Sequence, residues 1–157
     1  MGTVLKISEK TARKLYKDSS NEFKIICEET FGKEFFSKEI TDRVKSYEDA
    51  CIETGEIPVN ESKMVEIGFT QDEIAYRKIK TVTKALNEGW EADWKDKDQS
   101  KWFPWFYLSS DGFVSRDASY SCLSVYGGSG SHLSFKSEKL AKYAGTQFTD
   151  LYKSFIL

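Results

Sequence analysis

The residues with the greatest chemical capacity are concentrated in the stretch 101–136. It reads KWFPWFYLSSDGFVSRDASYSCLSVYGGSGSHLSFK and holds the one histidine of the chain, His132, beside a loop rich in glycine and serine. Aromatic rings can stack on bases, and glycine or serine amides in a turn can hold phosphate oxygens. This composition favours the binding of a nucleotide-like small molecule over any particular reaction.

Ten residues of this stretch are the candidate ligand-binding residues. The aromatic members would stack on the ligand, while the loop and its neighbouring cations would contact phosphate oxygens. The set is Trp102, Trp105, Tyr107, Arg116, Tyr126, Ser129, Gly130, Ser131, His132 and Lys136. The alternative is that the aromatic residues are simply core and that the loop is only a hairpin connection.

A catalytic arrangement is difficult to assemble from this sequence. His132 has no histidine companion, and no serine or cysteine lies in a recognised nucleophile signature. Cys122 and His132 would be close if the strands that carry them were neighbours, but strand adjacency alone would produce that pair. We therefore expect no catalytic residues, and an enzyme that processes nucleotides or nucleic acid is kept as an alternative function.

Two acidic strings are similar to metal sites without matching them. Asp93, Asp96 and Asp98 suggest a calcium loop, but the frame from Asp93 lacks the required glycine and the final glutamate. Glu91, Asp93 and Lys95 give a nuclease-like string, which falls after a helix rather than on a strand. The cysteines and the histidine lack the chelating pairs of structural zinc sites. We expect neither a metal nor a cofactor.

Three short helices are predicted before residue 56. Ser8 is a suitable N-cap for the first, and the second is expected to begin near Ser20 or Asn21. The third is expected from Thr41, as its N-cap, to Gly55, where a left-handed residue would end it. A proline and an asparagine then favour an irregular connection over residues 56–69.

The strongest helix is predicted to begin at a capping box. Thr70 and Glu73 have the spacing in which each side chain bonds the other residue's backbone N–H, and Gly89 is expected to close the helix. Four cations lie mainly off its apolar stripe: Arg77, Lys78, Lys80 and Lys84. They could contact phosphate, but a run of charges is more often a solvated helix face.

The fold class is predicted to be α+β in a single domain over 1–157. It comprises N-terminal helices, one long central helix, a three- to four-stranded antiparallel sheet over about 102–136, and a C-terminal helix packed on that sheet. The expected strands cover residues 102–108, 113–115, 119–126 and 131–136. The last helix is expected to start at Ser137 and to continue to Phe155, with Gly145 at a close approach to the sheet.

Composition narrows the choice of partners. The 23 basic and 25 acidic residues give a net charge of -2, so no global field attracts nucleic acid or an anionic membrane. We see no secretory leader and no apolar run of membrane-spanning length, and we expect a cytoplasmic protein. Three cysteines without a CxxC spacing indicate reduced thiols. Association into a homo-oligomer is left open.

Five segments, spread over nearly the whole chain, carry a resemblance to known sequences. They are LYKDSSNEFKIICEETFGKEFF, YEDAC, KALNEGWEADW, WFPWF and GSxLxFKSEKLAKYAGxQFxDLYKxF. Together they resemble a family of small uncharacterised proteins encoded by bacteriophages and prophages. The chain departs from that family at His132, where other members have arginine, which preserves a cationic or donor role rather than one specific to imidazole.

The resemblance implies a phage origin and transfers no catalytic residue. Small non-enzymatic phage proteins often act by binding, and one group of them sequesters the nucleotide signals of host immune systems. We therefore predict a phage-type binding protein in the host cytoplasm that sequesters a nucleotide-like immune signal through an aromatic sheet surface and a Gly/Ser loop. The alternatives are a protein–protein interaction or phage assembly protein, and the enzyme named above.

Overall fold

The computed structural model describes residues 7–16, 18–36, 39–110, 112–124 and 131–157. The chain divides into two compact units, Met1–Arg43 and Val44–Leu157. The described residues form helices and one antiparallel sheet, so the predicted α+β class is confirmed. The single domain over 1–157 stays a prediction.

The first unit is helical. It contains α1 (Glu9–Tyr16), α2 (Asn21–Phe31), the 3-10 helix η1 (Lys33–Phe36) and α3 (Ile40–Arg43). The predicted start near Ser20 or Asn21 is confirmed, and Ser20 is the N-cap, since its hydroxyl accepts a hydrogen bond from Phe23 N at 3.4 Å. The rings of Tyr16 and Phe36 stack with their centroids 4.2 Å apart. Aromatic packing therefore joins the N-terminal helices of this unit.

The helix predicted from Thr41 to Gly55 is in fact two helices, because a second N-cap interrupts it. After α3 ends at Arg43, α4 (Tyr47–Thr54) begins behind a capping box. Ser46 Oγ accepts from Asp49 N at 3.1 Å, and the Asp49 carboxylate accepts from Ser46 N at 2.9 Å. These two bonds satisfy backbone donors that a continuous helix would have used internally. The predicted stop is confirmed, since Gly55 has the left-handed φ of 73°.

The connection predicted to be irregular over 56–69 contains a short helix, so that prediction was wrong for part of the segment. The helix is α5 (Glu61–Glu66). Its N-cap is Asn60, whose Oδ1 accepts from Lys63 N at 3.0 Å. The asparagine side chain accepts a hydrogen bond from a backbone N–H of the first helical turn, and this stabilises the short helix α5 after the proline.

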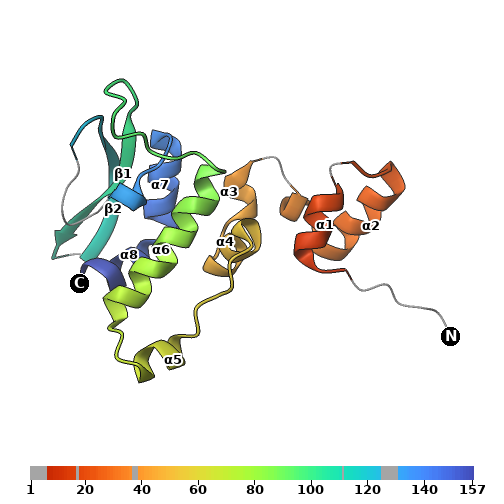
Figure 1. The fold of residues 1–157 in the computed structure, drawn as a ribbon, viewed down its shortest axis with the longest axis horizontal. Helices are drawn as coiled ribbons and strands as arrows, with labels where there is room; N and C mark the ends of the chain where they lie inside the picture. Colours follow the sequence, from red (N-terminus) through yellow and green to blue (C-terminus); the bar gives the residue numbers. More distant parts are fainter. Residues whose placement is uncertain (1–6, 17, 37–38, 111, 125–130) are drawn as a thin grey trace. The chain divides into compact units, whose positions relative to one another are not determined.

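The long helix α6 (Gln71–Asn87) is the central element of the second unit and was predicted correctly. The carboxylate of Glu73 accepts from the backbone N–H and the hydroxyl of Thr70, at 2.8 and 3.0 Å. The helix ends where Glu88 and Gly89 adopt positive φ, 50° and 85°. Figure 1 shows α6, in green, between α4 and the group formed by the hairpin, α7 and α8. Its buried residues include Ile74, Ile79, Val82 and Leu86.

The sheet has two strands within the described residues, not the predicted three or four. β1 (Lys101–Ser109) pairs with β2 (Gly112–Ser121) in antiparallel register. The separate strands predicted over 113–115 and 119–126 are one strand that contains a β-bulge. Trp105 pairs with Asp117 and Phe106 with Ser115, which leaves Arg116 as the extra residue. Because the bulge accommodates the extra residue, β2 stays paired with β1 across the position where the alternating sequence pattern is interrupted.

The strand predicted over 131–136 is reduced to a single bridge. Trp102 and Phe135 exchange two backbone hydrogen bonds, of 3.0 and 2.8 Å, at the edge of β1 that does not pair with β2. The preceding residues form the 3-10 helix η2 (Ser131–Leu133) instead of a strand. Residues 125–130, which include the predicted Gly/Ser loop, lie outside the described residues.

The predicted C-terminal helix is interrupted. α7 (Glu138–Gln147) and α8 (Thr149–Ile156) meet at Phe148, whose φ and ψ are -113° and 29°. Beside this break, the Thr149 hydroxyl donates to the carbonyls of Gly145 and Thr146 at 2.6 and 2.9 Å. Such bonding to the preceding turn competes with the helical ladder and bends helices. The predicted cap at Ser137 is confirmed.

One face of the hairpin packs on α7 and α8. A Cβ on Gly145 would lie 2.5 Å from Ser115 Oγ and 2.9 Å from Pro104 Cβ, so the predicted close approach at this glycine is confirmed. Further along the same face, the rings of Phe106 and Tyr152 have centroids 4.9 Å apart. The helices therefore cover the hairpin face that carries Pro104 and Phe106.

Candidate functional site

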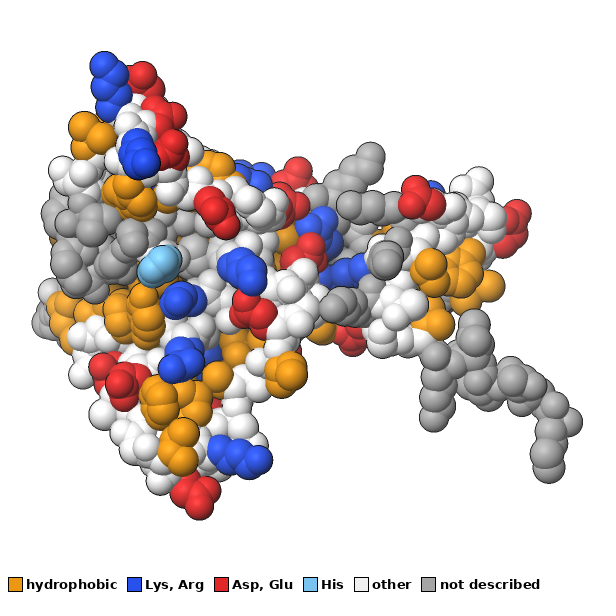
Figure 2. Space-filling view, in the orientation of Figure 1, with side chains coloured by type: hydrophobic (Ala, Val, Ile, Leu, Met, Phe, Trp, Pro, Cys, Tyr) orange, Lys and Arg blue, Asp and Glu red, His pale blue; other side chains and the backbone are white. Residues whose placement is uncertain are grey.

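A cavity of about 690 Å³ lies against one face of α6, within the second unit. Its walls come from four parts of the chain: Tyr47 with residues 56–59, the α6 side chains, the segment 90–94, and His132 with Ser134. Figure 2 shows the histidine beside Lys and Arg side chains on the face that it displays. The cavity thus joins segments that are far apart in the sequence.

Three cations line the cavity from α6. Arg77, Lys80 and Lys84 have the i, i+3, i+7 spacing that places side chains on one helix face. Lys84 forms an ion pair with Glu56 at 2.7 Å. In the part of the chain that the structure describes, Arg77 and Lys80 have no carboxylate within ion-pair distance. Neighbouring like charges on a helix face repel, which favours an added anion.

Two tryptophans contribute to the aromatic part of the wall. Trp90 follows the end of α6, and its backbone N–H donates to Asn87 O at 3.0 Å. Trp94 lies against a buried ammonium group, with Lys101 Nζ 5.4 Å from the ring centroid. That ammonium also donates to the carbonyls of Asp96 and Cys122 at 2.8 and 2.9 Å. Lys101 thus ties the segment that carries Trp94 to the end of the hairpin.

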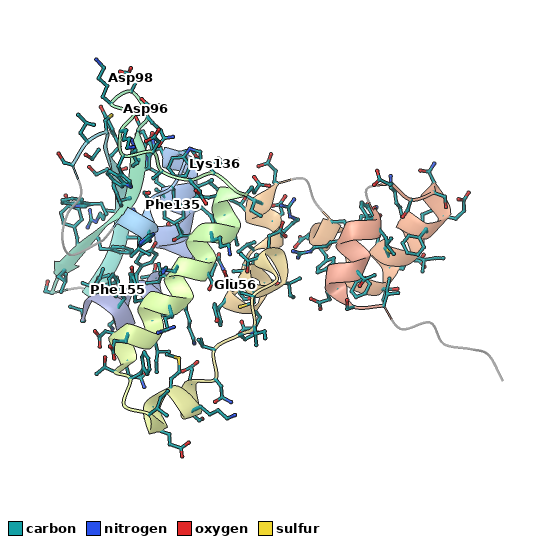
Figure 3. The ribbon with its side chains drawn as sticks, in the orientation of Figure 1. Glu56, Asp96, Asp98, Phe135, Lys136 and Phe155 are labelled. Atoms are coloured by element: carbon teal, nitrogen blue, oxygen red, sulfur yellow. The ribbon has the colours of Figure 1, made fainter. Side chains whose placement is uncertain are left out.

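The aspartates of the segment 90–100 serve as turn formers. Asp93 Oδ1 accepts from Lys95 N at 2.8 Å, and Asp96 Oδ1 accepts from Asp98 N at the same distance. Figure 3 shows Asp96 and Asp98 at the outer end of this segment. Across the described ranges, no group of three His, Cys, Asp or Glu side chains could hold a metal ion.

Asn87 places the segment that carries His132. Its Nδ2 donates to Ser134 O at 2.8 Å, and its Oδ1 accepts from Lys136 N at 3.0 Å. The side chain is buried, and both of its polar atoms are hydrogen-bonded to these backbone groups. The amide therefore attaches η2 to the end of α6 and brings the exposed His132 to the cavity.

Glu56 provides a negative charge within this cationic surface. Its oxygens contact Lys84 Nζ and Thr81 Oγ1, each at 2.7 Å. These hydrogen bonds, the one from Lys84 first, hold the pKa of Glu56 below its ordinary value. Figure 3 shows Glu56 at the side of α6 that faces α4. The cavity also has Glu91 on its wall.

Tyr47, the first residue of α4, lines the cavity. Its hydroxyl accepts a hydrogen bond from Val59 N at 3.0 Å, which holds the segment after α4 against the helix. Burial raises the pKa of Tyr47 to about 12. The phenol is therefore neutral at physiological pH and serves the cavity as an aromatic, hydrogen-bonding wall.

The predicted ligand-binding residues that the structure describes do not lie together in one place. His132 lines the cavity, whereas the aromatic residues of the hairpin do not. Trp105 and Tyr107 are 46% and 53% exposed on β1, and the Arg116 guanidinium carbon lies 5.8 Å from the Tyr107 ring centroid. These three residues form a separate surface. Whether they bind a ligand stays a prediction.

The remaining predicted residues have other surroundings. The Trp102 ring lies 4.8 Å from that of Tyr120, and Lys136 forms an ion pair with Glu88 at 3.0 Å. Ser131 is the first residue of η2. Tyr126, Ser129 and Gly130 lie outside the described residues, so their role stays a prediction.

Sequence reasoning missed the cations of α6 as site residues, because a charged helix face is commonly solvated. Two signals could have identified them. The spacing of Arg77, Lys80 and Lys84 places their side chains on one face of the helix, and Trp90 comes soon after the end of that helix. Lys78 falls outside that spacing and pairs with Glu61 instead.

Two further observations complete the description of the chain. Cys27, Cys51 and Cys122 are free, and the first two are buried. None of the helices in the described ranges is both long and apolar enough to cross a membrane.

A scan against protein-family models and searches of the curated proteins and the solved structures give no match to this chain.

Proposed function

We propose that the protein binds a nucleotide-like ligand in the cavity on α6 without catalysing a reaction on it. One observation carries this proposal: Arg77 and Lys80, which have no carboxylate within ion-pair distance among the described residues, line the same cavity as two tryptophans. Cations attract phosphate, and indole rings stack on bases. A volume of about 690 Å³ is also within the range of small-molecule pockets.

This proposal keeps the ligand class expected from the sequence and moves the site. Among the residues that the structure describes, one cation, Arg116, contacts the hairpin surface around Trp105 and Tyr107. The α6 cavity has three lysine or arginine side chains and a histidine. Because phosphate recognition depends on several donors and positive charges, the cavity is the better candidate.

The biological role that we propose is sequestration. The resemblance of the sequence to phage and prophage proteins supports a setting in the host cytoplasm, where a nucleotide that signals infection would be withdrawn by binding. No reaction on the ligand is needed for that role. A protein of this kind acts in proportion to its concentration and leaves its ligand chemically unchanged.

Calorimetry of the intact protein against mononucleotides, cyclic nucleotides and ADP-ribose derivatives tests the proposal. We expect heat from at least one class, and the Arg77→Gln, Lys80→Gln double variant should weaken binding by about tenfold or more. Lys78→Gln is the matched control, because Lys78 lies on the same helix but pairs with Glu61. The absence of heat from every class, or an equal loss in the control, would refute the proposal. Recovery of an altered nucleotide would establish an enzyme instead.

A second candidate function rests on a different observation. Several large apolar side chains of the hairpin are exposed: Trp105, Tyr107, Leu108, Val114 and Tyr120. Exposed apolar surface of this kind marks protein interaction sites. Copurification of a phage or host protein with the wild type, lost in a Trp105→Ser, Tyr107→Ser variant, would favour this function over nucleotide binding.

A further inference from the structure

One carboxylate on the cavity wall has no partner among the residues that the structure describes. Glu91 lines the cavity with an exposed side chain, and it takes part in no hydrogen bond or ion pair within the described ranges. The other carboxylate of the wall, Glu56, is bonded to Lys84 and Thr81. Glu91 is therefore an acceptor that a ligand can reach without breaking a contact of that kind.

The backbone on both sides of Glu91 is held in place. Before it, the Trp90 N–H donates to Asn87 O at 3.0 Å. After it, the Asp93 N–H donates to Gln99 Oε1 at 2.7 Å. Residues 90–93 form neither helix nor strand, so these bonds position the segment in place of a helical ladder. A carboxylate on a segment that is already positioned loses less entropy when a ligand binds to it.

Glu91 shares the cavity wall with both tryptophans. It directly follows Trp90 and precedes Trp94 by three residues. A base that stacks on an indole ring there can turn its hydrogen-bonding edge toward the carboxylate. The cations Arg77 and Lys80 line the cavity from α6 instead. Because a carboxylate repels phosphate and these cations attract it, the ligand is oriented with its base toward Glu91 and its phosphate toward α6.

A carboxylate distinguishes the bases by the groups on their Watson–Crick edges, because it accepts hydrogen bonds and donates none. Guanine has two adjacent donors there, N1–H and the 2-amino group, which match the two oxygens of one carboxylate. Adenine and cytosine have a ring acceptor beside their amino group, and uracil has a carbonyl oxygen on each side of its one donor. These acceptors would face the carboxylate without a hydrogen bond, which weakens binding.

We infer, on the basis of the proposed nucleotide site, that Glu91 determines specificity by accepting two hydrogen bonds from a guanine base. The ligand class is therefore a guanine nucleotide, whose base contacts the indole wall and whose phosphate interacts with Arg77 and Lys80. A bidentate contact between a side chain and a base edge discriminates against other bases by about tenfold or more.

Guanosine, inosine and adenosine monophosphates are suitable probes, because they share sugar and phosphate and differ only in the base. Calorimetry should show that the wild type binds guanosine monophosphate about tenfold more tightly than either of the others, since inosine lacks the 2-amino group. In Glu91→Gln, the amide can both donate to and accept from adenine, so the preference for guanosine over adenosine monophosphate should fall to about twofold or less.

The measured quantity is the ratio of two affinities within one variant. Removal of a negative charge strengthens the binding of all three monophosphates alike and leaves their ratio unchanged. Asp98→Asn is the matched control, because Asp98 is an exposed carboxylate of the same segment that does not line the cavity. This variant should keep the preference of the wild type.

The outcomes separate this inference from the proposed function. If the wild type binds adenosine monophosphate as tightly as guanosine monophosphate, or if Glu91→Gln keeps the wild-type preference, the role of Glu91 is overturned and the nucleotide site stands. An equal loss of preference in Asp98→Asn would also overturn it. If no monophosphate binds, the inference fails, and the proposed function fails with it when cyclic nucleotides and ADP-ribose derivatives give no heat either.

The inosine probe keeps the inference falsifiable should Glu91→Gln fail to fold. It removes one of the two donors from the ligand and leaves the protein unchanged. Equal binding of inosine and guanosine monophosphates by the wild type would show that the 2-amino group has no acceptor in the cavity, and would overturn the assignment of Glu91.

Discussion

The hairpin and the cavity use aromatic side chains in different ways. In the hairpin, rings contact other rings: Phe106 lies 4.7 Å from Phe113 and 4.9 Å from Tyr152, measured between centroids. At the cavity, Trp90 and Trp94 are grouped with the cations of α6. Aromatic content alone is therefore a sign of packing. Aromatic rings that share a cavity with cations such as Arg77 and Lys80, which have no carboxylate within ion-pair distance among the described residues, are the better sign of a ligand surface.

The largest expected effect tests the packing of the hairpin. Gly145→Val would place a side chain where Ser115 and Pro104 already lie, and overpacking of this kind lowers the free energy of unfolding by about 3 kcal/mol. Urea unfolding measures the loss. Thr146→Val, at the exposed neighbouring position, should have an effect of about 0.5 kcal/mol or less. Equal stability of the two variants would show that α7 does not pack closely on the hairpin.

A smaller effect is expected from a pair of tryptophan variants, and it bears directly on the comparison. Trp94→Ala should weaken nucleotide binding by about 1–3 kcal/mol, the contribution of one stacked base. Trp105→Ala should leave the affinity unchanged, because that ring does not line the cavity. Calorimetry with the tightest-binding nucleotide measures both, after thermal melts confirm folding. A larger loss in Trp105→Ala would return the site to the hairpin.

The smallest expected effect concerns the charge of Glu56. Its folded-state pKa is lowered, so its contribution to stability is present above the unfolded pKa and is lost as the pH falls through the folded pKa. The side chain is 37% exposed, so we expect less than about 1 kcal/mol. Urea unfolding should show wild type more stable than Glu56→Gln at about pH 7, with a smaller difference at about pH 3. A difference of the same size at both pH values would contradict this account.

Local signals explain which elements were predictable. The helix α6 follows from Thr70 and Glu73, which lie three residues apart and set its start through their own hydrogen bonds. The capping box of Ser46 and Asp49 has the same spacing of three residues, so the sequence also contains a signal for the start of α4 that was not used. By contrast, the break at Phe148 leaves the apolar stripe of α7 and α8 in helical register, so periodicity predicts one helix.

The site was less predictable than the fold, because it depends on contacts between distant segments. His132 was identified as a candidate, but its neighbours were sought in the sheet rather than on α6. The link is the Asn87 side chain, which bonds backbone groups of residues 134 and 136. No propensity or period indicates such a bond. The cations could be placed on one helix face from spacing alone, but their presence in the same cavity as Trp94 could not be predicted.

The bonds of Asn87 also have a consequence for the order of assembly. They join residues separated by 47 and 49 positions, whereas the strands of the hairpin are adjacent in the chain. Hairpins close in microseconds, and closing a longer loop costs more entropy. During synthesis from the N-terminus, α6 and the hairpin can form before the part of the cavity wall that carries His132 is in place. The cavity therefore acquires its histidine only after the ribosome has released residue 136.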